Sequence, residues 1–242
     1  MAEPDFQLFT TIRYDPLLVT YPVDSHLAFT AAKTSPRGSP FYMLNYHRDR
    51  LLRSSVYFGW VQAIKVIEGE EGMEYFRSKL EDEILLQNLG DGLSCLPLRV
   101  KVILSYNGSF TIEKALTSPV KFKNLYPDCL SEIAEINTES EPSGNTSSTK
   151  IYSLELSQIQ TQPTVHTRHK TTHRFHYDLA RERAGLKGML EPREVLLLNS
   201  RGEISEGSIT TIYFKRFGVW VTPCLESGGQ DGTTRRWALD HG

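Results

Sequence analysis

Apolar side chains recur at helical spacing in the first third of the chain. One set, at steps of three and four residues, consists of Met73, Phe76, Leu80 and Ile84. A similar spacing runs through residues 43–58. Such steps place side chains on one face of an α-helix, so both segments are predicted to be amphipathic helices.

Strand signals flank these helices. Residues 6–20 are rich in Phe, Leu, Ile, Tyr and Thr, and Asp15-Pro16 interrupts them as a turn would. Residues 98–106 and 110–115 flank Asn107-Gly108, the strongest short hairpin signal. The first half is therefore predicted to be an antiparallel sheet with helices packed against it.

The character of the sequence changes between residues 131 and 164. Residues 137–150 contain no apolar side chain and are too polar to bury anything, so we expect a mobile loop there. The pattern divides the chain into a small α+β domain at 1–124, an inter-domain segment at 125–164 and a second domain at 165–242.

The second domain is also predicted to mix helix and strand. Residues 175–186 are typical of a helix that ends near Gly185. Three later segments favour strands, namely 194–199, 211–214 and 219–222. The fold class is therefore α+β or α/β, in two domains.

Composition limits the function. The chain has 242 residues, 39% of them hydrophobic, and a formal net charge of −2, so we expect no nucleic-acid or membrane partner and a small substrate. No secretory pattern or membrane-length apolar run is visible, which favours the cytoplasm. Cys95, Cys129 and Cys224 are far apart, without a metal-binding spacing, so no metal site is expected.

The candidate chemistry lies in the last third of the chain. Lys170 could attach covalently to an aldehyde, Glu206 could hold a cationic ring nitrogen, and Gly232-Thr233-Thr234 could hold a phosphate through backbone amides. These are the three handles of pyridoxal 5′-phosphate. Alone, each has an ordinary alternative: a solvated lysine, an exposed hairpin glutamate and a helix cap.

An arginine-rich helix could add a phosphate contact. Arg48, Arg50 and Arg53 lie close together in the segment predicted to be helical, and guanidinium binds phosphate through paired donors. Three arginines this close together usually form a solvated helix face. The residues alone do not choose among them.

Four ordered blocks resemble those of a known family. They are residues 47–51, which read His-Arg-Asp-Arg-Leu, the block at Lys170, Glu206-Gly207 and residues 232–235. They are similar to those of the fold-type IV pyridoxal-phosphate enzymes, which include branched-chain and D-amino acid aminotransferases and 4-amino-4-deoxychorismate lyases. The resemblance implies a larger, barrel-like C-terminal domain and a homodimer.

The resemblance also implies roles for single residues. Lys170 would carry the cofactor and Glu206 would pair with its ring nitrogen. Arg50, rather than Arg48 or Arg53, would bind the phosphate, and Thr233 and Thr234 would hold it through their amides. Thr211 departs from the family, since many members carry Asn there.

Within the family, two segments are similar to those of the lyases. Residues 9–13 read Phe-Thr-Thr-Ile-Arg, and residues 170–174 read Lys-Thr-Thr-His-Arg. The similarity is strongest to fungal lyases and implies conversion of 4-amino-4-deoxychorismate to 4-aminobenzoate and pyruvate for folate synthesis. Thr11 would then help to position the substrate, although a strand threonine paired across a sheet is an equal alternative.

Other hypotheses stay open. A class IV aminotransferase would use every cofactor residue named above. Relatives usually continue past a turn like that at residues 232–236, so we also consider a truncated, inactive remnant or a binding module. The arginines available for substrate carboxylates are not ranked by the sequence; they are Arg13, Arg99, Arg168 and Arg174.

Overall fold

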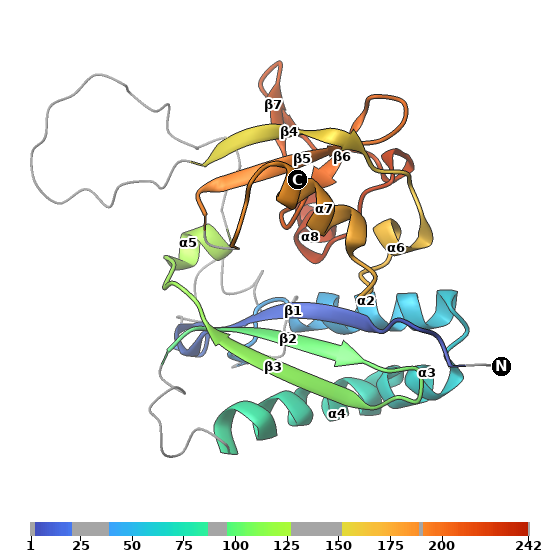
Figure 1. Cartoon of the computed structure of the whole chain (residues 1–242). Coiled ribbons are helices and arrows are strands. Elements are labelled where there is room, and N and C mark those ends of the chain that lie inside the picture. The colour runs from blue at the N-terminus through green and yellow to red at the C-terminus, as the bar shows by residue number, and fades with distance from the viewer. Residues whose placement is uncertain (1–2, 21–38, 87–95, 127–151, 189–190, 242) are drawn as a thin grey trace, which may run out of the picture. The chain divides into compact units, whose positions relative to one another are not determined.

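The computed structural model describes residues 3–20, 39–86, 96–126, 152–188 and 191–241 (Figure 1). The chain forms two compact units. The first unit comprises residues 1–128, 169–173 and 231–242, and the second comprises residues 129–168 and 174–230. Neither unit is continuous in sequence, whereas the expected domains are; the division at residues 124 and 164 stays a prediction.

The first unit contains a three-stranded antiparallel sheet in the order β1-β2-β3. Its strands are β1 (Leu8–Tyr14), β2 (Leu98–Leu104) and β3 (Phe110–Leu116). The predicted hairpin is confirmed: Gly108 adopts φ 87°, and the Ser109 amide donates to Asn107 Oδ1 at 3.0 Å. A positive φ suits glycine because it has no Cβ.

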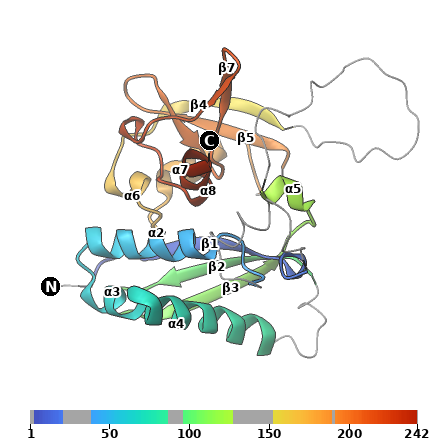
Figure 2. The ribbon, with the colours of Figure 1, turned by 180° about the vertical axis from the view of Figure 1, so that it is seen from behind.

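Three helices cover one face of this sheet (Figures 1 and 2). They are α2 (Leu44–Tyr57), α3 (Val61–Ile67) and α4 (Gly69–Glu81), and α4 continues into a π-helical turn, η2 (Asp82–Leu86). Alternate residues of β1 enter the shared core, and Leu8 and Ile12 are fully buried. Each such side chain contributes about 1.5–3 kcal/mol. The two predicted helices are confirmed.

The remaining elements of the first unit are short. They are a 3-10 turn, η1 (Pro16–Leu18), and the helices α5 (Phe122–Leu125) and α8 (Thr233–His241). Trp237 of α8 packs with Met43 and Tyr126 in a small apolar cluster. This packing fixes α8 within the unit.

Residues 169–173 join the first unit by pairing with the start of β1. The Phe9 amide donates to the Lys170 carbonyl at 2.9 Å, and the Thr172 amide donates to the Gln7 carbonyl at 2.8 Å. Leu8 and Thr171 form an antiparallel bridge between these bonds. Lys170 is therefore held by backbone contacts to β1, an edge strand of the first sheet.

The second unit is built on a mixed sheet in the order β4-β5-β6. Its strands are β4 (Ser153–Gln160), β5 (Arg193–Leu198) and β6 (Ile204–Gly207), with β4 parallel and β6 antiparallel to β5. A hairpin of β7 (Phe214–Arg216) and β8 (Val219–Val221) follows. The short helices are α6 (Val165–Arg168), α7 (Phe175–Arg183) and η5 (Leu225–Ser227).

Helix α7 packs on this sheet through one apolar cluster. Tyr177 and Ala180 of the helix meet Val195 and Leu197 of β5. The helix ends before Gly185, which adopts φ 68°, as the sequence predicts.

Some predicted elements are wrong. Only Phe214 of the expected strand at 211–214 lies in a strand, and the segment Ile204–Gly207 forms a sheet strand instead. Strand β4 lies inside the predicted inter-domain segment. The sequence also predicts a helix that begins at Arg235, after Thr233 and Thr234, but both threonines lie in the first turn of α8.

Several expectations fall outside the described residues, namely the loop at 137–150, Cys95 and Cys129. Within the described ranges, no helix has the length and apolar character needed to cross a bilayer.

Candidate active site

The structure separates the three arginines of α2. Arg50 donates from Nη2 to Thr10 Oγ1 of β1. Arg53 is exposed and pairs with Asp231 at 2.6 Å, and Arg48 contacts Asp49 at 3.3 Å. Of the three arginines, Arg50 alone contacts Thr10, a buried polar residue of β1.

A relay of hydrogen bonds links Arg50 to a buried histidine. Thr10 Oγ1 lies 2.6 Å from His47 Nδ1, and both residues are buried. Arginine only donates, so Thr10 accepts from Arg50 and donates its own proton to His47 Nδ1. Burial, with the nearby charges of Arg50 and Lys170, holds the pKa of His47 well below its usual value. His47 is therefore neutral, with its proton on Nε2.

Arg50 has a donor that the described residues do not use. Its Nε is buried and makes no hydrogen bond within the described part of the chain. Burial and the neighbouring charge of Arg236 lower the pKa of Arg50 to about 10. A buried donor without an acceptor is costly, so this guanidinium is suited to an anion that the described residues do not supply.

A cavity of about 220 Å³ lies in the first unit. Its lining comes from β1, β2, α2 and α8, and includes Thr11, His47, Arg99, Thr233 and Thr234. The N–H groups of a helix's first turn have no acceptor within the helix, and they favour an anion. Two predicted phosphate residues and the predicted substrate threonine thus line one cavity.

Lys170, in a turn paired with β1, has its side chain on the same face of that strand as Phe9 and Thr11. Lys170 pairs with Phe9, and its Nζ lies 4.9 Å from the centre of the Phe9 ring. Thr11 follows Phe9 by two residues, and alternate residues of a strand share a face. The proposed covalent amine is half-buried and lies beside an aromatic ring.

Two arginines of the same sheet line the cavity but differ in their contacts. Arg13 donates twice to Asp15, at 2.7 and 2.9 Å, and once to the Ser118 carbonyl at 3.1 Å. Arg99 lies opposite Arg13 in the strand register and is exposed. The Arg13 guanidinium is thus occupied by contacts within the first unit, and Arg99 is the better candidate to bind a substrate carboxylate.

Glu206, Arg168 and Arg174 belong to the second unit. Glu206 lies on β6, half-buried, and its Oε1 accepts a hydrogen bond from the hydroxyl of Tyr177. Gln230 Nε2 lies 3.1 Å from the same hydroxyl. Arg174 donates to the Ser208 carbonyl at 3.1 Å, so its guanidinium contributes to the structure of this unit.

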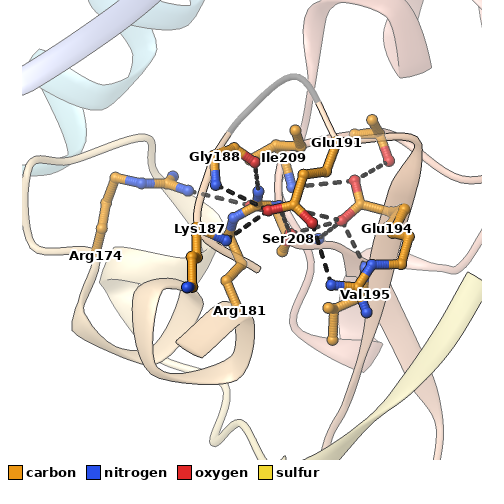
Figure 3. A network of polar contacts seen from close by, with 11 residues as sticks. Arg174, Arg181, Lys187, Gly188, Glu191, Glu194, Val195, Ser208 and Ile209 are labelled. Carbon is orange, nitrogen blue, oxygen red and sulfur yellow. Dashed lines mark hydrogen bonds and ion pairs between the residues drawn. The ribbon is translucent and has the colours of Figure 1, made fainter. Parts of the chain in front are cut away.

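The turn after Glu206 closes around a buried carboxylate (Figure 3). Glu194, 4% exposed, accepts from the Val195 and Ser208 amides at 2.8 and 3.0 Å and from the Ser208 hydroxyl at 2.6 Å. The Ile209 amide and the Thr210 hydroxyl also donate to it, at 3.3 and 2.6 Å. These contacts explain why residues 208–210 leave the sheet rather than continue as a strand.

The sequence interpretation missed four residues of these networks. Thr10 is a polar residue at an inward position of β1, between Leu8 and Ile12, and that alternation could have revealed it. Glu194 opens an apolar run as a lone charge, which is a weaker signal. His47 and Tyr177 stood in recognised segments, but nothing local indicated their long-range partners.

The fold and these groups define a two-unit α+β protein with a cavity-lining helix start, a lysine in a turn that pairs with β1, and a buried and a half-buried carboxylate. Comparison with known proteins agrees: residues 27–242 match the model of the amino-transferase class IV family. The chain belongs to this family.

Individual relatives are more distant. A Schizosaccharomyces pombe protein provisionally named aminodeoxychorismate lyase is 40% identical over 50 residues, which span 21% of this chain and 22% of that protein. The match thus covers about a fifth of the curated relative's length.

Solved structures share the fold. A provisionally named amino-acid aminotransferase from Mesorhizobium loti superposes with TM-score 0.59 and 24% identity, covering 98% of this chain and 83% of that one. A provisionally named 4-amino-4-deoxychorismate lyase from Legionella pneumophila gives TM-score 0.59 at 15% identity, covering 97% and 68%. Chains named as both activities thus share this architecture.

Members of this family depend on pyridoxal phosphate. The groups of the first unit fit its phosphate: Arg50 has an unused buried donor, and Thr233 and Thr234 open a helix at the cavity. The same unit supplies the Lys170 amine. The donor set therefore agrees with the cofactor that the family requires.

Proposed function

We propose that the protein is a carbon-oxygen lyase that converts 4-amino-4-deoxychorismate to 4-aminobenzoate and pyruvate. The pairing of the two lyase-like segments carries this proposal: the Phe9 amide of residues 9–13 donates to the Lys170 carbonyl of residues 170–174 at 2.9 Å. The S. pombe relative supports the same activity by its name.

The residues divide the work of holding the cofactor. Arg50 binds its phosphate through the guanidinium, and the first-turn amides of Thr233 and Thr234 add donors and the helix dipole. Lys170 would carry the covalent link to the cofactor, and Glu206 would pair with its ring nitrogen. When bound, pyridoxal phosphate supplies a ring that accepts the electron pair left by removal of a proton from carbon.

Lys170 then moves the proton. Once released from the cofactor, its Nζ would remove the proton from the carbon that bears the substrate amine. The C–O bond to the enolpyruvyl group breaks, the ring becomes aromatic, and the leaving group takes up a proton to become pyruvate. No second amino acceptor enters this balance.

Arg99 and Thr11 recognise the substrate in this proposal. The substrate carries two carboxylates, and the exposed guanidinium of Arg99 lines the cavity without a hydrogen bond or ion pair to any described residue. The Thr11 hydroxyl, in the same lining, would hold the substrate for reaction with Lys170. Both residues orient the substrate and neither holds the cofactor.

The test is product formation without a keto acid. Wild-type protein loaded with pyridoxal phosphate should release 4-aminobenzoate and pyruvate in equal amounts. Lys170→Ala should abolish both, and Lys187→Ala should not, because Lys187 is an exposed lysine whose contact to Glu191 is made by its backbone amide. Borohydride reduction and peptide mapping should label Lys170.

An aminotransferase is the second candidate, favoured by the name of the M. loti structure. Amino transfer from a branched-chain or D-amino acid that requires a keto acid, with no 4-aminobenzoate from aminodeoxychorismate, would replace the lyase proposal. A wild-type protein that stays colourless with saturating pyridoxal phosphate would exclude both activities and support a remnant or binding module.

We also propose that the protein works as a homodimer in the cytoplasm. The family to which the chain belongs supports both statements. Sedimentation equilibrium of the loaded protein and localisation of a tagged chain would test them.

A further inference from the structure

Tyr177 joins the apolar core of the second unit to the carboxylate of Glu206. Its side chain is 1% exposed and packs with Ala180 and Val195, while its hydroxyl donates to Glu206 Oε1. The Arg174 guanidinium lies 4.4 Å from the centre of the tyrosine ring. The packed ring therefore holds the Tyr177 hydroxyl in a fixed position.

The hydrogen-bond direction at this hydroxyl is fixed by proton count. An ionised carboxylate only accepts, so the single Tyr177 proton goes to Glu206. Gln230 must then present its N–H to the tyrosine oxygen, at 3.1 Å. Burial, and next the negative charge of Glu206, raise the pKa of Tyr177, which keeps the hydroxyl protonated and donating.

The backbone that carries Glu206 is fixed separately. Glu194 holds the next turn through the Ser208 and Ile209 amides (Figure 3), and Gly207 fits so closely that a Cβ would lie 2.5 Å from Thr210 Oγ1. Because the main chain is fixed, the Glu206 carboxylate can move only by side-chain rotation. The hydrogen bond from Tyr177 restricts that rotation.

We propose that Tyr177, supported by Gln230, is a positioning residue that fixes the Glu206 carboxylate for the ring nitrogen of the cofactor. This inference rests on the proposed role of Glu206 in cofactor binding and extends it. It does not depend on which of the two reactions the protein catalyses, because both need the same protonated ring.

The consequence is measurable on the bound cofactor. Without the hydroxyl, the carboxylate turns away part of the time, the ring nitrogen holds its proton less firmly, and the ring withdraws fewer electrons from the covalent link. The proton on that link is then held more tightly. The pH at which the visible absorbance of the bound cofactor changes should therefore be higher than in the wild type.

The experiment compares Tyr177→Phe with Ser157→Ala in full-length protein loaded with pyridoxal phosphate. Phenylalanine keeps the ring and its packing and removes only the hydroxyl. Ser157 is a buried residue of the same unit whose hydroxyl donates to the Ile159 carbonyl at 2.8 Å, so its loss controls for a missing buried hydrogen bond. Both variants should lower the melting temperature by similar amounts.

Only Tyr177→Phe should move the titration of bound-cofactor absorbance, by about one pH unit upward, and weaken cofactor binding about tenfold, as expected for a lost hydrogen bond to a charged group. Its kcat should fall about tenfold with little change in KM. Gln230→Leu should shift the absorbance titration in the same direction by a smaller amount.

A double-mutant cycle identifies the route of the effect. In a Glu206→Gln background, adding Tyr177→Phe should leave the absorbance titration unchanged, because the carboxylate that the hydroxyl positions is gone. A further shift of full size would show that Tyr177 acts elsewhere and would overturn the proposal.

The outcomes separate this inference from the proposed function. A Tyr177→Phe protein that titrates like wild type and Ser157→Ala refutes the positioning role alone. A shifted titration in a protein that makes no 4-aminobenzoate keeps the positioning role and refutes the lyase. A wild-type protein that never binds the cofactor refutes both.

Discussion

Two charged side chains with buried polar atoms, Glu194 and Arg50, have opposite surroundings. In the second unit the carboxylate of Glu194 accepts from five donors and lies 4.0 Å from Arg181. In the first unit Arg50 donates to Thr10, and its buried Nε has no acceptor among the described residues.

The difference distinguishes a scaffold from a site. A fully satisfied ion has nothing left to offer a ligand, and removing it leaves its partners unpaired. An unsatisfied ion costs stability in the free protein and recovers it when the missing partner binds. Loss of Glu194 should therefore lower the free energy of unfolding, and loss of Arg50 should lower the affinity for the cofactor.

The largest effect is expected from Glu194→Ala. It leaves the buried Ser208 amide and hydroxyl and the buried Val195 amide without their acceptor, so the free energy of unfolding should fall by about 3–5 kcal/mol. Urea denaturation of the cofactor-free protein measures it. Glu191→Ala is the matched control, because this partly exposed carboxylate also accepts two backbone amides and should cost less than about 1 kcal/mol. Equal losses would contradict the scaffold role.

Arg50→Met should separate binding from stability. The affinity for pyridoxal phosphate should fall about 100-fold, which corresponds to about 2.7 kcal/mol. The melting temperature of the cofactor-free protein should hold or rise, because the native state, which depresses the pKa of Arg50 to about 10, disfavours the charge. Calorimetric titration and thermal denaturation measure the two effects.

Arg53→Met is the control for this prediction. Arg53 is on the same helix but exposed, paired with Asp231, and its loss should change cofactor affinity less than threefold or so. A cofactor-free Arg50→Met protein that melts well below wild type would show that Arg50 is structural, and the contrast with Glu194 would then fail.

Local patterns predicted the parts of the fold that local sequence determines. The helix at Gly69–Glu81 followed from apolar spacing, and the hairpin followed from Asn107-Gly108. Strand β4 could not be found in this way, because Leu154 and Leu156 are 60% and 55% exposed and its pairing depends on β5, far along the chain. Helix α3, with seven residues, is too short to show a repeat.

The candidate site divides in the same manner. Ordered sequence blocks pointed to Lys170, Arg50 and Glu206, whose roles stay predictions. The partners of these residues could not be read from the sequence, since Thr10 and His47 are 37 positions apart and Tyr177 and Glu206 are 29 apart. Hydrogen bonds over such separations are fixed only when tertiary packing brings the strands and helices together.

The smallest predicted effect is the contribution of His47, which is hydrogen-bonded to Thr10, to the pH dependence of stability. The pKa of His47 is depressed in the native state, so the unfolded chain binds a proton that the folded chain refuses below about pH 6.5. Protonation therefore favours unfolding, and stability present above that pH is lost as the pH falls, by at most about 1.4 kcal/mol per unit. His47→Asn keeps an acceptor near Nδ1 but cannot be protonated, so its unfolding free energy should fall less steeply between pH 7 and 5. The control is His241→Asn at an exposed position, which should leave the slope of unfolding free energy against pH as in the wild type. If His47→Asn also has the wild-type slope, the Thr10 contact does not require a neutral ring.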